Sequence, residues 1–269
     1  MTIQLSVRAD AGAEAAGAVA AVVGSLPVSL KPAVNTADVV AVDGSAGWTR
    51  RAADAVKKGA KGVVVVSPVA EDPTAFVALA AKSNTAVVLD QQWAGNPALA
   101  DSQTNVRAVL NGALAEAVLV DSVAYASPGS DPDALLTEHL AVILKCGLEG
   151  REWQAVQRNR HGYVVTARLS NGAPVALHGV LTSSVPATAA VSILTASGRA
   201  DFVLPDPYAA SPAEVRSVTP DGASTLPTIY ETAHRHTWTR LRDRLASGVS
   251  GSDLEQYAAL TSLVRQLTT

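Results

Sequence analysis

The chain has 269 residues, enough for one large or two modest domains. Hydrophobic residues make up 48% of it and aromatic residues only 4%, so its core must be built mainly from Ala, Val and Leu. The net charge of −3 argues against nucleic acid as a partner. The single cysteine, Cys146, excludes an internal disulfide and any metal site with several cysteine ligands.

No apolar run reaches the ~18 residues that span a bilayer, and the first twelve residues lack the basic and apolar regions of a secretory signal. We therefore expect a cytoplasmic protein with no membrane partner. A reducing compartment is compatible with the lone cysteine.

Val-rich runs alternate with Ala-rich segments through the first hundred residues. Continuous apolar strands separated by helices are typical of a parallel sheet that is covered on both faces. The pattern predicts helices at residues 11–23, 48–58 and 72–83, and strands at residues 3–7, 27–30, 38–42, 62–66 and 85–89.

Three loops follow predicted strands, at residues 43–47, 67–68 and 90–96. The carboxyl ends of parallel strands lie at one edge of a sheet, where its ligands bind, so we expect these loops to converge on one crevice. The alternative is that they are ordinary strand ends and turns. The candidate ligand-contacting residues in and next to the first two loops are Asp43, Gly44, Ser45, Trp48, Ser67 and Pro68.

The second half of the chain has strands joined by turn signals, Ser170-Asn171-Gly172 and Ser197-Gly198, which predict a mostly antiparallel sheet. We place a first domain at residues 1–100 and a second at 101–269, whose two closing helices could pack back on the first. The predicted helices are 135–148, 230–247 and 252–267, and the predicted strands are 118–125, 163–169, 174–180, 190–195 and 199–204.

The strand, helix and strand within residues 37–73, ending in Val66-Ser67-Pro68, resemble the nucleotide-binding domain of the Gfo/Idh/MocA oxidoreductases. In that family the strand ends in Glu-Lys-Pro and the lysine is catalytic, so Ser67 stands at the position of the lysine. Residues 136–150 resemble the helix that carries an active-site histidine, which here is His139. The resemblance implies a Rossmann-like domain followed by an open-sheet domain. It also implies NAD or NADP as cofactor and a sugar, polyol or related hydroxy compound as substrate.

Several family features are altered. Only Gly12 remains of the G-x-G-x-x-G motif that cradles a pyrophosphate, and Asp10 and Glu14 bring negative charge there. Trp48 replaces a family histidine and could stack on a ligand or fill the space of one. Two hypotheses stay open: an oxidoreductase with a degenerate site, or a non-catalytic homologue that binds a small ligand or assembles with an active paralogue.

We expect a homo-oligomer formed through the antiparallel sheet, since sheet faces of this kind make dimers and tetramers in the family. The residues expected to supply its apolar outer face are Val175, Leu177, Val191, Ile193 and Leu194.

His139 is either a substrate-contacting residue or a histidine packed in the interior. No metal site is predicted, because no ligand spacing is present, and Cys146 is expected to be a buried, inert thiol. The remaining histidines are expected to be structural or exposed; they are His161, His178, His234 and His236.

Overall fold

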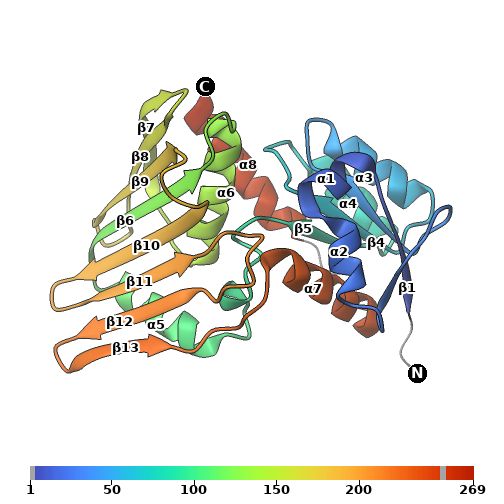
Figure 1. Cartoon of the computed structure of the whole chain (residues 1–269). Coiled ribbons are helices and arrows are strands. Elements are labelled where there is room, and N and C mark those ends of the chain that lie inside the picture. The colour runs from blue at the N-terminus through green and yellow to red at the C-terminus, as the bar shows by residue number, and fades with distance from the viewer. Residues whose placement is uncertain (1–3, 249–252) are drawn as a thin grey trace. The chain divides into compact units, whose positions relative to one another are not determined.

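A computed structural model describes residues 4–248 and 253–269. The chain divides into two compact units (Figure 1). The first comprises Met1–Gly95 and Ala233–Ser262, and the second comprises Asn96–Thr232 and Leu263–Thr269. The predicted starts of the first strand at residue 3 and of the last helix at residue 252 lie outside the described residues.

The first unit contains a five-stranded sheet in the order β2-β1-β3-β4-β5, in which all neighbouring strands are parallel. This confirms the predicted parallel sheet. The three strands β3 to β5 are Val-rich and almost entirely buried, as expected for a sheet covered on both faces. The strands are β1 (Leu5–Ala9), β2 (Leu30–Pro32), β3 (Val39–Asp43), β4 (Gly62–Val66) and β5 (Ala86–Asp90).

Helices pack on this sheet through regularly spaced apolar residues. In α3, Trp48, Ala52, Ala55 and Val56 follow helical spacing, so they share one buried face. The last helix, α8, begins in the first unit and ends in the second. The helices are α1 (Ala11–Gly17), α2 (Val19–Gly24), α3 (Trp48–Lys57), α4 (Thr74–Lys82), α7 (Ala233–Ser247) and α8 (Leu254–Thr268).

The single helix predicted at residues 11–23 is wrong, because the chain breaks at Ala18. Ala18 adopts a left-handed conformation with φ of 45°, and its N–H donates to the carbonyl of Glu14 to close α1. The Glu14 carboxylate then accepts from the N–H of Ala20 at 2.9 Å in the first turn of α2. These local contacts compensate an αL residue that the sequence pattern does not reveal.

The second unit contains an eight-stranded sheet in the order β13-β12-β11-β10-β6-β9-β8-β7. All neighbours are antiparallel except β6 and β9, and both predicted turns join antiparallel strands, β8 to β9 and β10 to β11. The strands are β6 (Ala117–Ala126), β7 (Arg151–Asn159), β8 (Gly162–Arg168), β9 (Pro174–Leu181), β10 (Thr188–Thr195), β11 (Arg199–Leu204), β12 (Glu214–Thr219) and β13 (Gly222–Leu226).

The second unit also contains the short helix η1 (Pro97–Leu99) and two longer helices, α5 (Thr104–Ala115) and α6 (Pro132–Lys145). Both longer helices cover one face of the sheet, α5 over β10 and β11 and α6 over β6, β8, β9 and β10. Helix α5 and strands β7, β12 and β13 are not predicted from the sequence. The missed strands at the sheet's ends are largely exposed and polar, so they lack the apolar pattern that marks the central strands.

The assignment of the sheet's outer face was wrong for four residues. Val175, Leu177, Val191 and Ile193 are at most 1% exposed and belong to the face that the helices cover. Side chains alternate along a strand, so their neighbours occupy the opposite face. The half-buried apolar residues on that opposite face are Val123, Val164, Val180, Leu194 and Val203.

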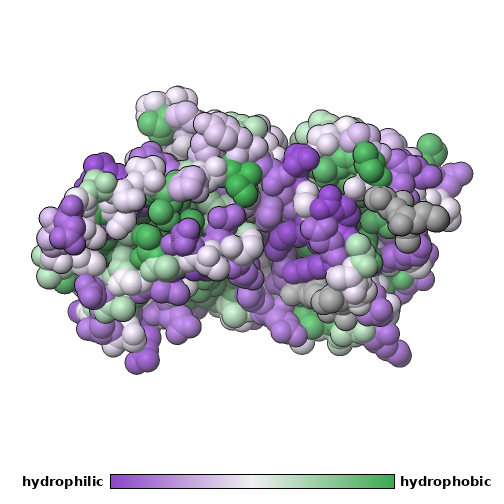
Figure 2. All heavy atoms as spheres, turned by 90° about the horizontal axis from the view of Figure 1, so that it is seen from below, coloured by the Kyte–Doolittle hydropathy of each residue, from purple (hydrophilic) through white to green (hydrophobic). Residues whose placement is uncertain are grey.

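Hydrophilic and hydrophobic residues are interspersed on the face of the molecule that Figure 2 shows. Across residues 4–248 and 253–269, none of the helices has both the length and the apolar composition needed to cross a bilayer.

Candidate functional site

Three strand ends of the first unit meet at one edge of the parallel sheet. Asp43, Val66 and Asp90 are paired across β3, β4 and β5, so the loops that follow them start side by side. The N–H of Gly44 donates to the carbonyl of Val66 at 2.8 Å, and a Cβ on Gly44 would lie only 2.3 Å from that oxygen. Glycine is therefore required there, and the first two predicted loops converge as expected.

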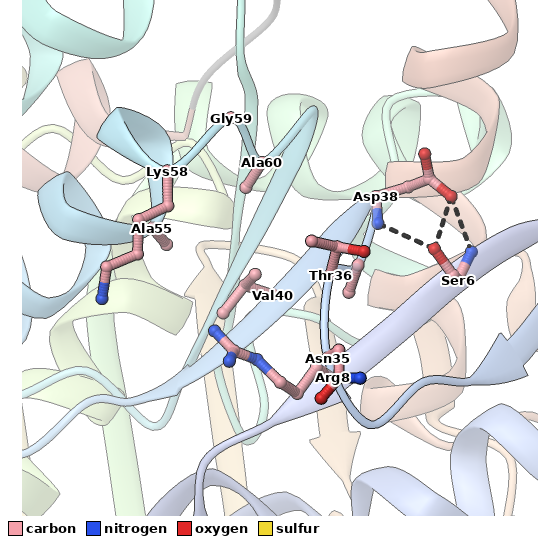
Figure 3. A pocket seen from close by; sticks show the side chains of 11 residues that line it. Ser6, Arg8, Asn35, Thr36, Asp38, Val40, Ala55, Lys58, Gly59 and Ala60 are labelled. Atoms are coloured by element: carbon pink, nitrogen blue, oxygen red, sulfur yellow. Dashed lines mark hydrogen bonds between the residues drawn. The ribbon is translucent and has the colours of Figure 1, made fainter.

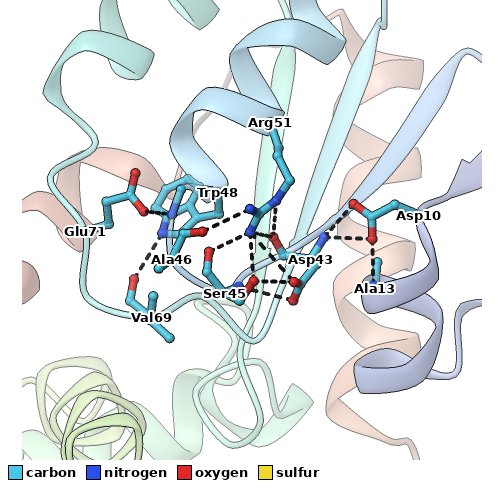
Figure 4. Close-up of polar contacts among 10 residues, drawn as sticks. Asp10, Ala13, Asp43, Ser45, Ala46, Trp48, Arg51, Val69 and Glu71 are labelled. Atoms are coloured by element: carbon cyan, nitrogen blue, oxygen red, sulfur yellow. Dashed lines mark hydrogen bonds and ion pairs between the residues drawn. The ribbon is translucent and has the colours of Figure 1, made fainter.

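The first of these loops is held by an internal network centred on Arg51 of α3 (Figure 4). Its Nη2 donates to the carbonyls of Asp43 at 2.8 Å and Ser45 at 2.6 Å, and its Nη1 donates to Ala46 at 3.0 Å. The Ser45 hydroxyl donates to the Asp43 carboxylate. These contacts commit the side chains of Asp43, Ser45 and Arg51 to the loop itself.

Two carboxylates occupy helix N-termini beside this loop. Asp10 caps α1 by accepting from the N–H of Ala13 at 2.7 Å, and it also accepts from the N–H of Asp43 at 3.0 Å. Glu71 accepts from the N–H of Gly47 at 2.6 Å, at the start of α3. One amide donor at the start of each helix is thus engaged by the protein's own acid, and helix dipoles favour negative charge at these positions.

Trp48 lies in the interior of the first unit. Its side chain is 0% exposed, its Nε1 donates to the carbonyl of Val69 at 3.0 Å, and its ring packs edge-on against Phe76 and Tyr257 with centroids 6.1 and 5.9 Å apart. Of the two interpretations offered for it, the space-filling one matches this placement.

Ser67 and Pro68 leave the end of β4 next to the first loop. Ser67 has a φ of 50°, a conformation unusual for a residue other than glycine, and its N–H donates to the carbonyl of Asp90 at 3.0 Å. The Pro68 carbonyl accepts from the hydroxyl of Tyr257 at 2.7 Å. Both residues are therefore built into the strand edge.

His234, expected to be a structural or exposed residue, is paired with Asp90, which is not among the predicted site residues. The Asp90 carboxylate is 0% exposed, and its Oδ2 accepts from Nδ1–H of His234 on α7 at 2.9 Å. An acid that directly ends an otherwise apolar strand was the available signal, because such an acid is buried at the ligand edge of the sheet.

His139 belongs to the second unit and is also 0% exposed. Its Nε2 lies 2.7 Å from the Ser122 hydroxyl, and its Nδ1 lies 2.9 Å from the hydroxyl of Tyr163. Ser122 donates its proton to the carbonyl of Ala190 at 2.7 Å, so its oxygen must accept from Nε2–H, and Nδ1 then accepts from Tyr163. Both ring nitrogens of the neutral imidazole are satisfied inside the protein.

Burial lowers the pKa of His139 to about 3, and the charge of His178 adds to the lowering. Burial likewise raises the pKa of Cys146 to about 12, against the opposing effect of Arg107, which makes the thiol inert. Among residues 4–248 and 253–269, no three His, Cys, Asp or Glu side chains are grouped as a metal ion would need.

A dinucleotide does not fit the residues after β1. A pyrophosphate needs free amides at a helix N-terminus, whereas Asp10 already accepts there. A Cβ on Gly12 would lie 2.7 Å from the side chain of Asp43, so α1 and the loop after β3 are in close contact. Two carboxylates, Asp10 and Asp43, thus stand where a diphosphate would add further negative charge.

No protein-family model matches the sequence, and no curated protein matches it. Among solved structures, the chain is similar to a 3-ketoreductase from Actinomadura kijaniata in complex with TDP-benzene and NADP. The TM-score is 0.70 at 14% identity, over 100% of this chain and 98% of that chain.

A dehydrogenase from Clostridium difficile gives a TM-score of 0.63 at 9% identity, covering 97% of both chains. A dehydrogenase from Chromobacterium violaceum gives 0.61 at 16% identity, covering 97% of this chain and 85% of that one. At such identities the likeness establishes the fold. The chain has the fold of the Gfo/Idh/MocA-type oxidoreductases, as the resemblance in its sequence predicts.

Proposed function

We propose that the protein is a non-catalytic homologue of these oxidoreductases, which keeps their scaffold to bind a small ligand and does not transfer hydride. The observation that carries this proposal is the Asp10 carboxylate, which accepts from the N–H of Ala13 at the N-terminus of α1. A pyrophosphate would have to displace a charged cap and lie beside Asp43. Like charges in contact oppose such binding.

The groups that would move a proton support the same conclusion. Hydride transfer to or from an alcohol requires a group that takes or gives the hydroxyl proton. Ser67 replaces the lysine of the family, and its N–H is used in pairing with Asp90. His139 is buried with both nitrogens bonded to Ser122 and Tyr163, so neither nitrogen is directed at a ligand.

The competing function is an oxidoreductase that uses NAD or NADP on a sugar, polyol or related hydroxy compound. The fold favours it, because the similar 3-ketoreductase was solved with NADP. On this alternative, the dinucleotide would bind in an altered way that moves Asp10 from the start of α1.

A titration with NADPH and NADH separates the two functions. Trp93, at 1% exposure in the loop after β5, and Trp48 would transfer energy to a bound reduced nicotinamide. We expect no saturable signal up to millimolar cofactor. Asp10→Ser removes the charge and keeps a good helix cap, so this variant should bind the cofactor more tightly than the wild type. Saturable micromolar binding by the wild type, with turnover of any polyol, would overturn the proposal.

We further propose that the protein assembles as a homo-oligomer, or with a paralogous subunit, through the outer face of the eight-stranded sheet. The half-buried residues Val123, Val180 and Leu194 supply apolar surface there. We expect sedimentation velocity to show a species larger than the monomer, and Val180→Lys to reduce it. A strictly monomeric wild type at tens of micromolar would rule out self-assembly.

A further inference from the structure

One side of the parallel sheet has a groove over β1. The chain passes from β1 through α1 and α2 to β2, and it then reaches β3 through residues 33–38 without a helix. On the face of the sheet opposite α1 and α2, α3 packs on β3 and β4. A cavity of about 500 Å³ lies beside it, lined by residues that include Arg8 of β1, Val40 of β3 and Lys58 after α3 (Figure 3).

The groove continues along the sheet. A second cavity of about 350 Å³ is also lined by Arg8, Val40 and Lys58, and it reaches Asp10 and Arg51. The first cavity instead reaches the segment before β3, including Asn35 and Thr36. Val39 and Asp43 are four residues apart on β3, so the start of this strand lies roughly 13 Å from its end at the loop edge described above.

The acids along this groove already have partners. Asp38 accepts from the N–H of Ser6 at 2.9 Å and pairs with Lys61 at 2.8 Å. Asp10 caps α1, and Asp54 lies 3.7 Å from Lys57. Negative charge in the groove is thereby compensated or held in hydrogen bonds.

Two cations of the groove, Arg8 and Lys58, are not compensated in this way, unlike Arg51, which is bonded to the loop after β3. Arg8 and Lys58 are exposed, and neither side chain forms a hydrogen bond or an ion pair with any of the residues the structure describes. Both side chains line the two cavities together with Val40 (Figure 3). The amide of Asn35 and the hydroxyl of Thr36 likewise have no hydrogen-bond partner within residues 4–248 and 253–269.

We propose that this groove is a binding site for a small phosphomonoester, a class of ligand that goes beyond the proposed function above. Arg8 and Lys58 hold the phosphate through charge-assisted hydrogen bonds. Asn35 and Thr36 contact the hydroxyl-bearing body of the ligand. The volume of about 500 Å³ is larger than an inorganic anion requires and lies in the range of small-ligand sites.

The test is calorimetric titration of the full chain with ribose 5-phosphate at low ionic strength. We expect one saturable site per chain and no binding of ribose. Arg8→Met and Lys58→Met should each weaken binding about ten-fold or more, because each removes a charged donor. Lys82→Met is the matched control: it removes the same charge from an exposed lysine of α4 that does not line the groove, and it should leave binding within about two-fold.

Each of three binding results would overturn the proposal: no saturable binding, an effect of Lys82→Met as large as that of Lys58→Met, or equal binding of succinate. Displacement of ribose 5-phosphate by NADH, which carries no phosphomonoester, would also overturn it, since the groove would then be part of a dinucleotide site. Failure of the non-catalytic proposal is recognised separately, as oxidation or reduction of a nicotinamide cofactor by the wild type with a sugar or polyol, measured without ribose 5-phosphate. Lys58 is exposed at the end of α3, so its variant should melt like the wild type.

Discussion

Replacing Asp90 by alanine is expected to lower the free energy of unfolding of the first unit by about 3 kcal/mol. The Asp90 carboxylate is 0% exposed, and Nδ1 of the 3%-exposed His234 lies 2.9 Å from its Oδ2. Removing one member of a buried polar pair leaves the other in a site that water does not reach. The pair also joins β5 to α7, two elements 144 positions apart in the sequence.

Urea unfolding followed by tryptophan emission reports mainly on the first unit. Three of the four tryptophans belong to it, Trp48, Trp93 and Trp238, and only Trp153 belongs to the second. Asp90→Asn keeps an oxygen that accepts from His234, so it should cost less than Asp90→Ala. Asp54→Ala, which removes an exposed acid 3.7 Å from Lys57, should change stability by no more than about 0.5 kcal/mol. A loss below about 1 kcal/mol for Asp90→Ala would show that the pair does not hold α7 in place.

The parallel sheet could be predicted because its signal is local. Each of β3, β4 and β5 is a run of apolar residues bounded by polar ones, and covered parallel strands require that composition. The convergence of the loops after Asp43 and Val66 then follows from the parallel register. The break at Ala18 could not be predicted, because a single left-handed residue between two Ala-rich helices leaves helical spacing intact.

The outer face of the second sheet shows a different limit. Strand alternation places Val175 and Leu177 on one face of the sheet and Val180 on the other. It likewise places Ile193 and Leu194 on opposite faces. Alternation alone does not say which of the two faces the helices cover. Contacts of α6 with β9 and β10 decide it. The missed α5 adds to this, because it is one of the two helices that cover the inner face, where it contacts β10 and β11.

The candidate site was predictable in position and not in chemistry. Asp43, Gly44, Ser45, Ser67 and Pro68 lie together at the expected edge. Whether a polar side chain there is available to a ligand depends on its partners. The commitment of Asp43 and Ser45 to Arg51 is a three-dimensional property. The burial of Trp48 is another, since its neighbour Tyr257 comes from the far end of the chain.

The second unit is expected to lose about 2 kcal/mol of stability as the pH falls from 6.5 to 5, because of His139. Its folded pKa of about 3 is lower than the ordinary value of 6.5. Between these values the unfolded chain binds the proton and the folded chain does not, so stability is full above about pH 6.5 and declines as the pH falls. Protonation in the folded state would require Nδ1 to lose the hydrogen bond that Tyr163 donates.

Urea titrations followed by circular dichroism at pH 7.5, 6.5 and 5 measure this dependence. His139→Asn can still donate to Ser122 and accept from Tyr163, but it does not titrate, so its stability should change by about 2 kcal/mol less over the same interval. His161→Asn, at an exposed turn, serves as the control and should retain the wild-type slope. Asp38 and Asp253 also have lowered pKa values, but their ordinary pKa is 3.8. Their contribution to the free energy of unfolding is therefore lost only below the pH range of this experiment. If the free energy of unfolding of His139→Asn changed with pH as much as that of the wild type, the imidazole would be protonated in the folded protein at pH 5. His139 would then again be a candidate acid.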